Sequence, residues 1–557
     1  MSSSTRRDLA IVLVVCALAF GWRLGRLGLI DPDEPFYAQT AVEMLARHDL
    51  VTPRIFDHPQ FEKPALFYWL ACASFAAGGR TEAAARLPGA AAATVLVLLT
   101  WGLGRRIFGA RAGLLAALVL ASGAAFAVTA RIMLTDMVFA LFLCASCFAF
   151  WRAVEAQEVR APSGRWIVLA AVVSALAVLT KGPLGILVPG LAVLAWRIFS
   201  RRPFPAGAGV VGLAAALWVA IAVPWYALMI QLHGMEYARA FFVHENFERL
   251  VRAEHPANNR LDYYPAVLIL GSWPWIPALA VTLMRARRLI GAPTGAPTGA
   301  PSDAGSAALY LAGWFASSFL FFSIAQSKLP TYVLFLFVPL ALLTGRALDA
   351  LLRDGFGSRV ERITALALAA LQALAPLAAL ALPAARPFAL PMLAAGAFLL
   401  GALALLVRGP SPAWVGATAV ATLALLVGAT GPAADAIEAR TSVRPAALAL
   451  QHVAGPEVPV LTSAFLARGL HYYTGRAAIV LSNREQPFFT PHPLPLVRGA
   501  RGLAEFVRAH GATLCVMRGE EWHDIERAAR RPIPDLQIPI GDKVLVRVGP
   551  EAIPALE

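Results

Sequence analysis

Charged residues are scarce in this chain. Asp, Glu, Lys and Arg make up 15% of its 557 residues, whereas soluble globular domains carry about 25%. Hydrophobic residues reach 58%, and the mean hydropathy is +0.64. The apolar residues are grouped in long runs. This pattern excludes an ordinary soluble globular protein and indicates a polytopic membrane protein.

Cysteine is also rare and offers no disulfide framework. The five cysteines are Cys16, Cys72, Cys144, Cys147 and Cys515. The CxxC spacing of Cys144 and Cys147 lies inside an apolar run without further ligands. A packing role is therefore expected for this pair rather than redox or metal chemistry.

Lysine is almost absent, although the net charge is +14. The four lysines are Lys63, Lys181, Lys328 and Lys543, and every other permanent cation is arginine. In a soluble protein this charge would suggest nucleic-acid binding. Here the arginines cluster at one end of the apolar runs, as the positive-inside rule predicts for a membrane protein. We therefore expect membrane lipids as partners and no nucleic acid.

The apolar runs predict thirteen transmembrane helices, because a bilayer core needs about 20 apolar residues per crossing. The arginine-rich short loops between them lie on the side of Arg6 and Arg7, which is predicted to be cytoplasmic. An odd number of spans then places the C-terminal region on the periplasmic side. The predicted spans are 9–28, 84–101, 113–130, 133–151, 166–180, 183–199, 207–227, 264–283, 306–323, 331–350, 363–383, 388–407 and 412–430.

Three segments are predicted to lie outside the membrane. Loops 29–82 and 231–263 interrupt a transmembrane domain of residues 1–430 and are long enough to carry function. Residues 431–557 form a separate periplasmic domain. Their apolar runs shorten to strand length at 458–461, 477–481, 513–517 and 544–548, with helical stretches such as 501–510 between them. The predicted fold class is an all-α polytopic membrane protein with a C-terminal soluble α/β domain.

Three of the lysines are predicted to share a site. Lys63, Lys181 and Lys328 all map to the periplasmic ends of spans or to the first outer loop. A lysine presents a compact cation with three donors, which suits it to bind phosphate. The simpler reading is chance together with snorkelling of long side chains to the interface. We favour a shared anion site.

The first outer loop opens with several acids, from Asp31 through Asp33 and Glu34. Such acids could bind a cationic sugar, orient a nucleophile or hold a metal. Alternatively, Asp31 or Asp33 caps a helix that runs from residue 34 to 47. Both readings can hold together, since capping occupies one carboxylate.

Asp136 is an ionisable residue near the outer end of an apolar run, and such residues are functional candidates by default. Arg131 precedes it by five residues, so a structural ion pair between the two is an equal alternative. A metal site built from Glu62 and His244, with Glu245 and His255 nearby, is a weaker expectation, because no fixed ligand spacing supports it.

Several motifs together resemble one family. They are residues 31–38 (DPDEPFYA), 61–64 (FEKP), 179–182 (LTKG), 241–249, 262–265 (DYYP), 271–275 (GSWPW) and 327–332 (SKLPTY). In this order they resemble the bacterial aminoarabinose transferases that modify lipid A, within the protein-mannosyltransferase-like GT-C class of glycosyltransferases. The resemblance covers about the first 350 residues.

The resemblance implies an activity. The enzyme would transfer 4-amino-4-deoxy-L-arabinose from undecaprenyl phosphate to a phosphate of lipid A, at the periplasmic face of the inner membrane. Masking of negative charge on lipid A would oppose polymyxin binding. The chain would act as a monomer and require no cofactor, with a divalent metal left open.

The resemblance also assigns residues. Asp33, Glu34, Lys63 and Asp136 are the catalytic candidates. The resemblance implies substrate binding by Tyr37, Glu62, Lys181, Lys328 and Tyr332. We expect the same of Arg54 and Arg131, which the quoted motifs do not contain. The sequence departs from the family pattern at two positions. Phe36 stands where members commonly have arginine, and Asn246 appears in place of a histidine, which leaves His244 as the nearest substitute.

Two alternatives remain at this point. The same chemistry could use another polyprenyl-linked sugar or a protein Ser/Thr acceptor, as in protein O-mannosylation. A different class of protein, a polyprenyl-lipid transporter, would be expected to show internal repeats and broken central helices. No clear repeat is present.

Overall fold

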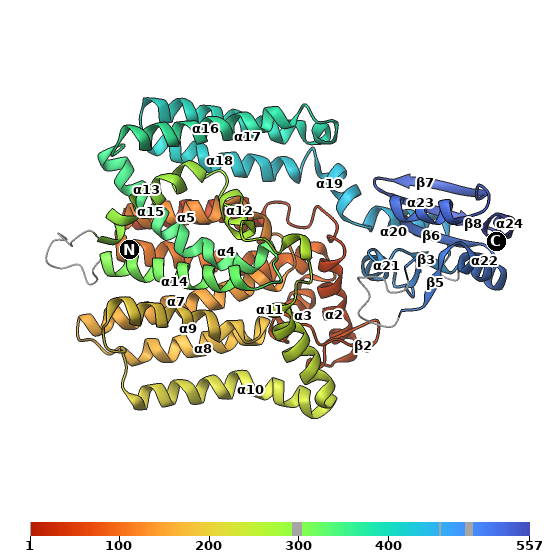
Figure 1. Cartoon of the computed structure of the whole chain (residues 1–557), viewed down its shortest axis with the longest axis horizontal. Helices are drawn as coiled ribbons and strands as arrows, with labels where there is room; N and C mark the ends of the chain where they lie inside the picture. Colours follow the sequence, from red (N-terminus) through yellow and green to blue (C-terminus); the bar gives the residue numbers. More distant parts are fainter. Residues whose placement is uncertain (1, 292–303, 456–457, 485–493) are drawn as a thin grey trace.

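The computed structural model describes residues 2–291, 304–455, 458–484 and 494–557. The chain forms a helical bundle followed by a smaller unit built on a β-sheet (Figure 1). The sheet unit lies beyond one end of the bundle, and the N-terminus lies at the opposite end. One end of the bundle is therefore next to the sheet unit, and the other is next to the N-terminus.

Nine helices within the described ranges are long and apolar enough to cross a membrane. Their length follows from apolar runs of about 20 residues, which exceed the typical helix of a soluble protein. The elements that form them are α4 (Glu82–Phe108), α7 (Thr135–Glu158), α8 (Gly164–Lys181), α10 (Ala208–Ala238), α14 (Ala304–Ile324), η4 (Pro330–Leu336) with α15 (Phe337–Asp354), α16 (Arg359–Ala379), η5 (Pro383–Phe388) with α17 (Ala389–Arg408), and α18 (Pro412–Ala429).

The other four predicted spans are shorter or broken helices. In the fourth of them, α12 and α13 bend by 118° at a short break and would form a tenth span if counted together. Helices thus occupy all thirteen predicted positions, but not all are of full length. These elements are α1 (Ser3–Cys16) with η1 (Ala17–Gly21), α5 (Ala110–Ser122) with α6 (Ala124–Thr129), α9 (Leu184–Ser200), and α12 (Tyr263–Gly271) with α13 (Ile276–Gly291).

Several bundle helices begin at side-chain caps. Thr81 accepts a hydrogen bond from the backbone N–H of Ala84 (3.2 Å), and Ser358 accepts one from Glu361 (3.1 Å). Each cap satisfies a donor that has no partner inside its helix. At the other end of α4, Gly109 adopts a positive φ of 97°, which a residue with a side chain would rarely adopt.

The first outer loop folds into α2 (Asp33–Arg47), the hairpin strands β1 (Arg54–Ile55) and β2 (His58–Pro59), and α3 (Leu66–Gly78). The expected side-chain cap of α2 is wrong, because the cap position is Pro32 and makes no side-chain hydrogen bond. Asp31 instead accepts a hydrogen bond from the backbone N–H of Val443 in the C-terminal unit (2.7 Å).

The second outer loop continues α10 beyond the bundle. Gly234 has a positive φ of 64°, and this non-helical residue kinks the chain there. The segment that follows is η2 (Arg239–Glu248), α11 (Arg249–Val251) and η3 (Pro256–Asn258). Figure 1 shows α11, α3 and α2 at the end of the bundle nearest the sheet unit.

The C-terminal unit is built on a six-stranded sheet of order β5-β4-β3-β6-β8-β7. The first four strands in this order are parallel, and β8 and β7 are antiparallel to their neighbours. The strands are β3 (Val460–Thr462), β4 (Ile479–Ser482), β5 (Leu496–Arg498), β6 (Thr513–Arg518), β7 (Asp535–Ile540) and β8 (Lys543–Val548).

Helices cover both faces of this sheet. Alternate residues of β6 point to opposite sides, so Cys515 packs in one apolar cluster and Leu514 in the other. One cluster includes α22 (Gly499–His510), α23 (Gly519–Ala528) and α24 (Ile553–Leu556), which follows η6 (Pro550–Ala552). The other includes α20 (Arg444–Val453) and α21 (Ala467–Thr474), and α19 (Ala434–Thr441) joins α20 to the bundle.

The C-terminal unit is docked on the first outer loop through polar contacts. Arg444 donates to Glu82 (2.7 Å), and the hydroxyl of Tyr473 accepts from the backbone N–H of Leu29 (2.8 Å). Arg444 is bound a second time by Glu438 of α19. These contacts hold α21 against α2.

Arginines predicted to be cytoplasmic form ion pairs at the end of the bundle that carries the N-terminus. Arg106 pairs with Glu155 (2.7 Å), and Arg285 pairs with Glu361. Arg105 donates to the hydroxyl of Thr5 (2.7 Å), which places this layer beside the N-terminal residues. The arginine layer and the sheet unit therefore lie at opposite ends of the bundle.

Candidate functional site

A chain of charged side chains links three separate segments at the sheet end of the bundle. The ammonium of Lys63 lies 2.9 Å from Glu245 Oε2, and Glu245 Oε1 lies 3.0 Å from a guanidinium nitrogen of Arg249. All three side chains are largely buried. Glu245 and Arg249 are four residues apart in η2 and α11, which is the spacing that brings side chains together on a helix.

Tyr332 connects this group to a second ion pair. Its hydroxyl accepts from Arg249 at 3.5 Å, and the ammonium of Lys181 lies 4.9 Å from the centre of its ring. Lys181 also donates to Asp136 Oδ1 at 2.5 Å. Lys63, Arg249 and Lys181 thus bring three cations to one place, each held by a carboxylate.

Asp136 was predicted either to have a functional role or to form a structural ion pair with Arg131, and the contacts test the second prediction. The Arg131–Asp136 pair is wrong, because Asp136 pairs with Lys181 and Arg131 donates to the carbonyls of Ala19 (3.1 Å) and Trp22 (2.7 Å). The α-helical geometry explains the error. Asp136 lies in the first turn of α7, whereas Arg131 precedes that helix and faces the end of the first one.

Asp33 and Glu62 lie beside the cations, and no hydrogen bond of either carboxylate is found within the described ranges. Burial raises the pKa of both groups. Arg468 and Lys63 act in the opposite direction on each, because nearby positive charge favours the ionised form. These two acids remain available to a ligand.

Glu34 has a different environment. Its side chain is fully buried and accepts hydrogen bonds from Arg86 Nε (2.8 Å) and a second Arg86 nitrogen (2.6 Å). The backbone N–H groups of Ile30 (2.7 Å) and Met133 (2.6 Å) also donate to it. Arg86 in turn donates to carbonyls of residues 24, 27 and 28. Both carboxylate oxygens are thus occupied by the protein itself.

The other predicted substrate-binding residues are dispersed. Tyr37 is buried next to Asp33, with its ring against Phe67. Arg54 lies in β1 and donates to the carbonyl of Asp57 at 3.3 Å. Lys328 donates to Asn259 at 2.9 Å. Of the three lysines predicted to share a site, the contacts through Tyr332 join only Lys63 and Lys181.

The tentative metal ligands are not part of one cluster. His244 is exposed and pairs with Glu248 at 2.8 Å, one helical turn away. Within the described ranges, no three His, Cys, Asp or Glu side chains are grouped so that they could hold a metal ion. Metal binding by Glu62 and His244 remains a prediction, which metal analysis of the purified protein would test.

Arg249 was not among the predicted site residues, and Glu245 was considered only as a neighbour of the possible metal site. Glu245 and Arg249 lie in a motif that the sequence analysis quoted, and their i,i+4 spacing of opposite charges was an available signal. No pattern in the sequence around Arg468 predicted a place in the site. Arg468 is one arginine of the C-terminal unit, and the docking of α21 on α2 brings it to Asp33 and Glu62.

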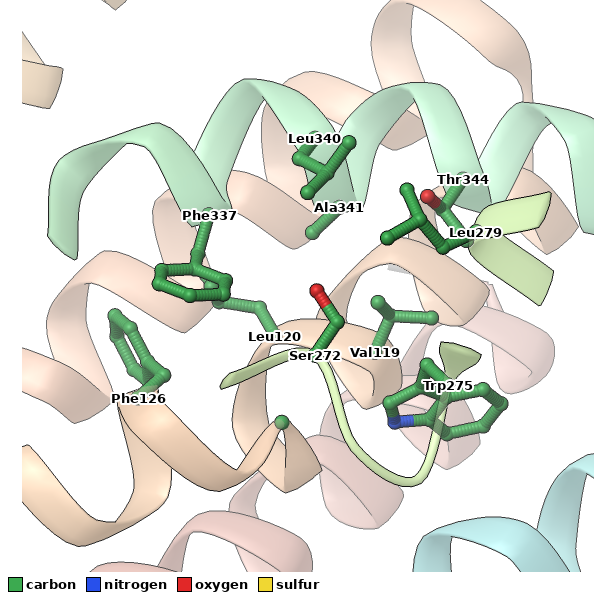
Figure 2. A pocket seen from close by; sticks show the side chains of 11 residues that line it. Val119, Leu120, Phe126, Ser272, Trp275, Leu279, Phe337, Leu340, Ala341 and Thr344 are labelled. Atoms are coloured by element: carbon green, nitrogen blue, oxygen red, sulfur yellow. The ribbon is translucent and has the colours of Figure 1, made fainter. Parts of the chain in front are cut away.

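A small cavity inside the bundle lies apart from this cluster. Figure 2 shows its apolar lining, with Ser272 and Thr344 among the few polar side chains. Its volume is about 20 Å³, enough for about one water molecule. It is too small for a lipid or a sugar, so we place the candidate site at the charged cluster.

Comparisons with known proteins agree on the type of protein. Residues 62–226 match the family model described as dolichyl-phosphate-mannose-protein mannosyltransferase. This stretch contains Lys63, Asp136 and Lys181. It covers about a third of the chain, so the full-length relatives carry more weight.

Two curated relatives are named undecaprenyl phosphate-α-4-amino-4-deoxy-L-arabinose arabinosyl transferase. The protein of Erwinia tasmaniensis is 32% identical over 421 residues, which cover 72% of this chain and 73% of the relative. The protein of Edwardsiella ictaluri is 35% identical over 327 residues, 57% of this chain and 55% of the relative. The chain spans 55–65% of the length of most of the curated relatives that it matches.

The crystal structure of ArnT from Cupriavidus metallidurans bound to undecaprenyl phosphate has the same fold. It superposes with a TM-score of 0.74 at 23% identity, and the match covers 98% of this chain and 97% of that one. The shared fold includes both the bundle and the sheet unit. With the Erwinia relative matched over nearly three quarters of its length, the chain belongs to the family of undecaprenyl phosphate-aminoarabinose arabinosyl transferases.

Proposed function

We propose that the protein transfers 4-amino-4-deoxy-L-arabinose from undecaprenyl phosphate to a phosphate of lipid A. The observation that carries the proposal is the buried group of Lys63, Arg249 and Lys181, which three separate segments bring together around Tyr332. Cations that are largely shielded from water favour a phosphate ligand. Membership of the family supports the choice of sugar and carrier.

The reaction would be a displacement at the anomeric carbon of the sugar. An oxygen of the lipid A phosphate forms the new bond, and the bond to the carrier phosphate breaks with its electron pair going to undecaprenyl phosphate. Negative charge therefore develops on the leaving phosphate. Lys63 and Arg249 would stabilise it, because donors fixed before the reaction need little reorganisation.

Glu245 would keep these cations in place before the donor arrives. It bridges Lys63 and Arg249 within hydrogen-bond distance of both. Asp136 would do the same for Lys181. A bound phosphate would then share cations that are already positioned, which avoids the cost of ordering long side chains during binding.

The free acids Asp33 and Glu62 would bind the amino group of the sugar. A carboxylate close to an ammonium ion gains a charge-assisted hydrogen bond, which is stronger than a neutral one. Lipid A phosphate is already an anion near neutral pH, so a strong general base is not required. Were the acceptor a Ser or Thr hydroxyl, Asp33 would be the base.

We also propose an orientation in the inner membrane. The arginine layer at the N-terminal end would face the cytoplasm, as the positive-inside rule requires. Thirteen crossings, some through short or broken helices, would then place the charged cluster and the sheet unit in the periplasm. We propose that the protein works as a monomer.

The test is mass spectrometry of lipid A from a host that lacks its own transferase and makes the amino-sugar donor. Expression of this chain should add the mass of aminoarabinose to lipid A. The Lys63→Ala variant should lose the modification, because removal of one donor to a developing charge costs about 10²–10³ in rate. Lys63→Arg, which keeps the charge, is the matched comparison.

An unmodified lipid A, despite confirmed membrane insertion of the wild type, would contradict the proposed donor and acceptor. Modification of a periplasmic protein in the same cells would instead favour a Ser/Thr acceptor. Unchanged modification by Lys63→Ala would remove the cationic cluster from the reaction.

A further inference from the structure

Arg468 is a buried cation that the chemistry above does not use. It lies in α21 of the C-terminal unit, and only 7% of its surface is exposed. Its guanidinium is stacked 4.6 Å from the ring centre of Phe36, and its Nε has no hydrogen-bond partner within the described ranges. A buried N–H without an acceptor is costly, so such a group indicates a missing ligand.

Most neighbours of Arg468 are residues of the candidate site. The groups that act on it electrostatically are Glu62, Asp33, Tyr37 and Tyr68. Burial lowers the pKa of its guanidinium, and the two carboxylates oppose that effect. The stack on Phe36 is a cation–π contact that fixes the plane of the guanidinium without using its N–H groups. These donors therefore remain free for an oxyanion.

The placement of Arg468 depends on how the C-terminal unit is docked. Next to it in the chain, Gly469 approaches Asp31 so closely that an added Cβ would come within 2.1 Å of Asp31 Oδ1. Asp31 in turn accepts from the N–H of Val443. The side chain of Asp31, just before α2, thus lies directly against Gly469 of α21. This contact brings Arg468 near Asp33.

We infer that Arg468 binds the phosphate of the acceptor, while Lys63 and Arg249 bind the phosphate of the donor. This inference rests on the proposed function. Both phosphates need cations, and the free acids Asp33 and Glu62 lie within electrostatic reach of Arg468 and of Lys63. The amino group of the sugar would be held by these acids, with a phosphate on each side.

The parts of the chain that supply the cations indicate which phosphate each cation binds. Lys63 and Arg249 come from the outer loops of the membrane bundle, where a carrier with a long lipid tail must enter. Arg468 comes from the soluble unit, which faces a headgroup that projects out of the membrane. A planar guanidinium also matches a phosphate with two parallel hydrogen bonds.

The experiment compares the Michaelis constants for donor and acceptor in purified full-length protein. Arg468→Gln should raise the KM for lipid A at least 10-fold and change the KM for the sugar donor less than twofold. The KM of Arg468→Lys for lipid A should lie between those of Arg468→Gln and the wild type, because lysine keeps the positive charge but lacks the planar guanidinium group. Arg501→Gln, at an exposed position of the same unit, is the control and should behave as wild type.

The pH profile gives a second readout that a purely structural role would not move. Burial already raises the pKa of Asp33, and the guanidinium of Arg468 partly offsets this. Loss of the cation raises the pKa of Asp33 further, so its ionised form requires a higher pH. The acid limb of kcat/KM should therefore shift to higher pH in Arg468→Gln relative to the wild type.

The outcomes separate the inference from the proposed function. A wild type that transfers no sugar to lipid A overturns the proposed function. An active wild type with equal changes in both Michaelis constants, or none, overturns the role of Arg468 alone. Loss of donor binding together with a lower melting temperature in Arg468→Gln would show that Arg468 only anchors the unit through Phe36, and this too would overturn the inference.

Discussion

Asp33 and Glu34 are adjacent in the chain, but their carboxylates have different surroundings. Glu34 forms a buried ion pair with Arg86 and accepts two backbone hydrogen bonds in addition. Asp33 faces the cationic cluster and Arg468. Successive residues on a helix point in directions about 100° apart, and this rotation separates an acid that supports the loop from one that is open to substrate.

The roles of these two acids can be separated by mutation. Glu34→Gln removes the charge that Arg86 needs, and loss of one partner of a buried pair costs about 3–5 kcal/mol of stability. Asp33→Asn should reduce transfer at least 10-fold and leave the melting temperature within about 2 °C, because no hydrogen bond among the described residues depends on its charge.

Thermal unfolding and transfer rates of the purified variants measure both effects. Asp31→Asn is the matched control for Asp33→Asn, because an amide oxygen can still accept from Val443. Equal transfer rates in these two variants would remove Asp33 from the site. An undiminished melting temperature in Glu34→Gln would contradict the supporting role of that residue.

Much of the site could be predicted from single residues. Lys63 and Lys181 stood out because lysine is rare, and Asp136 because it is an acid in an apolar run. The partner of Asp136 could not be predicted in this way. Arg131 is nearer in sequence, but Lys181, 45 positions away, is nearer in space. Arg468 depends on a contact between parts of the chain more than 400 positions apart, which no local pattern encodes.

At the scale of secondary-structure elements, α21 and α2 form the contact that joins the C-terminal unit to the site. Because position 469 has no side chain, α21 can approach Asp31, just before α2, closely. An added Cβ would lie 2.7 Å from Val443 as well as near Asp31. The two elements would have to move apart, and Arg468 would move with α21.

We expect Gly469→Ala to lower both stability and transfer. Forcing extra atoms into a closely packed contact costs about 1–3 kcal/mol, and displacement of Arg468 should raise the KM for lipid A. Gly502→Ala in α22 is the matched control, since its added Cβ would make only ordinary contacts, with Val497 at 3.4 Å and Arg498 at 3.9 Å. An alanine inside a helix should be neutral or slightly stabilising there.

Melting temperatures and initial transfer rates of the two alanine variants test this prediction. Equal behaviour of Gly469→Ala and Gly502→Ala would mean that the close approach does not control the docking of the unit. A fall in stability without any change in acceptor KM would separate docking from catalysis.

The strands of the C-terminal unit show which elements a sequence reveals. The apolar runs at 458–461, 477–481, 513–517 and 544–548 became β3, β4, β6 and β8. The other two strands gave no such signal. β5 has only three residues, and β7 is an exposed edge strand that contains Pro539. An edge strand is buried on fewer sides and tolerates proline, so its composition resembles that of a loop.

At the scale of the whole molecule, the two ends of the bundle differ in charge chemistry. The ion pairs described beside the N-terminus are arginine–carboxylate pairs, whereas the sheet end adds the Lys63 and Lys181 pairs and the free acids. If the arginine layer is cytoplasmic, an odd number of crossings must separate it from the sheet unit. Short helices such as α5 and α9 would then be true spans, packed among longer neighbours.

Cysteine labelling tests this arrangement directly, because all five native cysteines are buried. Ala528→Cys lies at an exposed position of α23, and Ala161→Cys lies at an exposed position after α7. In cells with a permeabilised outer membrane, a membrane-impermeant maleimide should label position 528 and spare position 161. Position 161 should react only after the inner membrane is opened. Labelling of both positions on the same side would require an even number of crossings between them. The arginine layer could then not face the cytoplasm while the charged cluster faces lipid A from the periplasm.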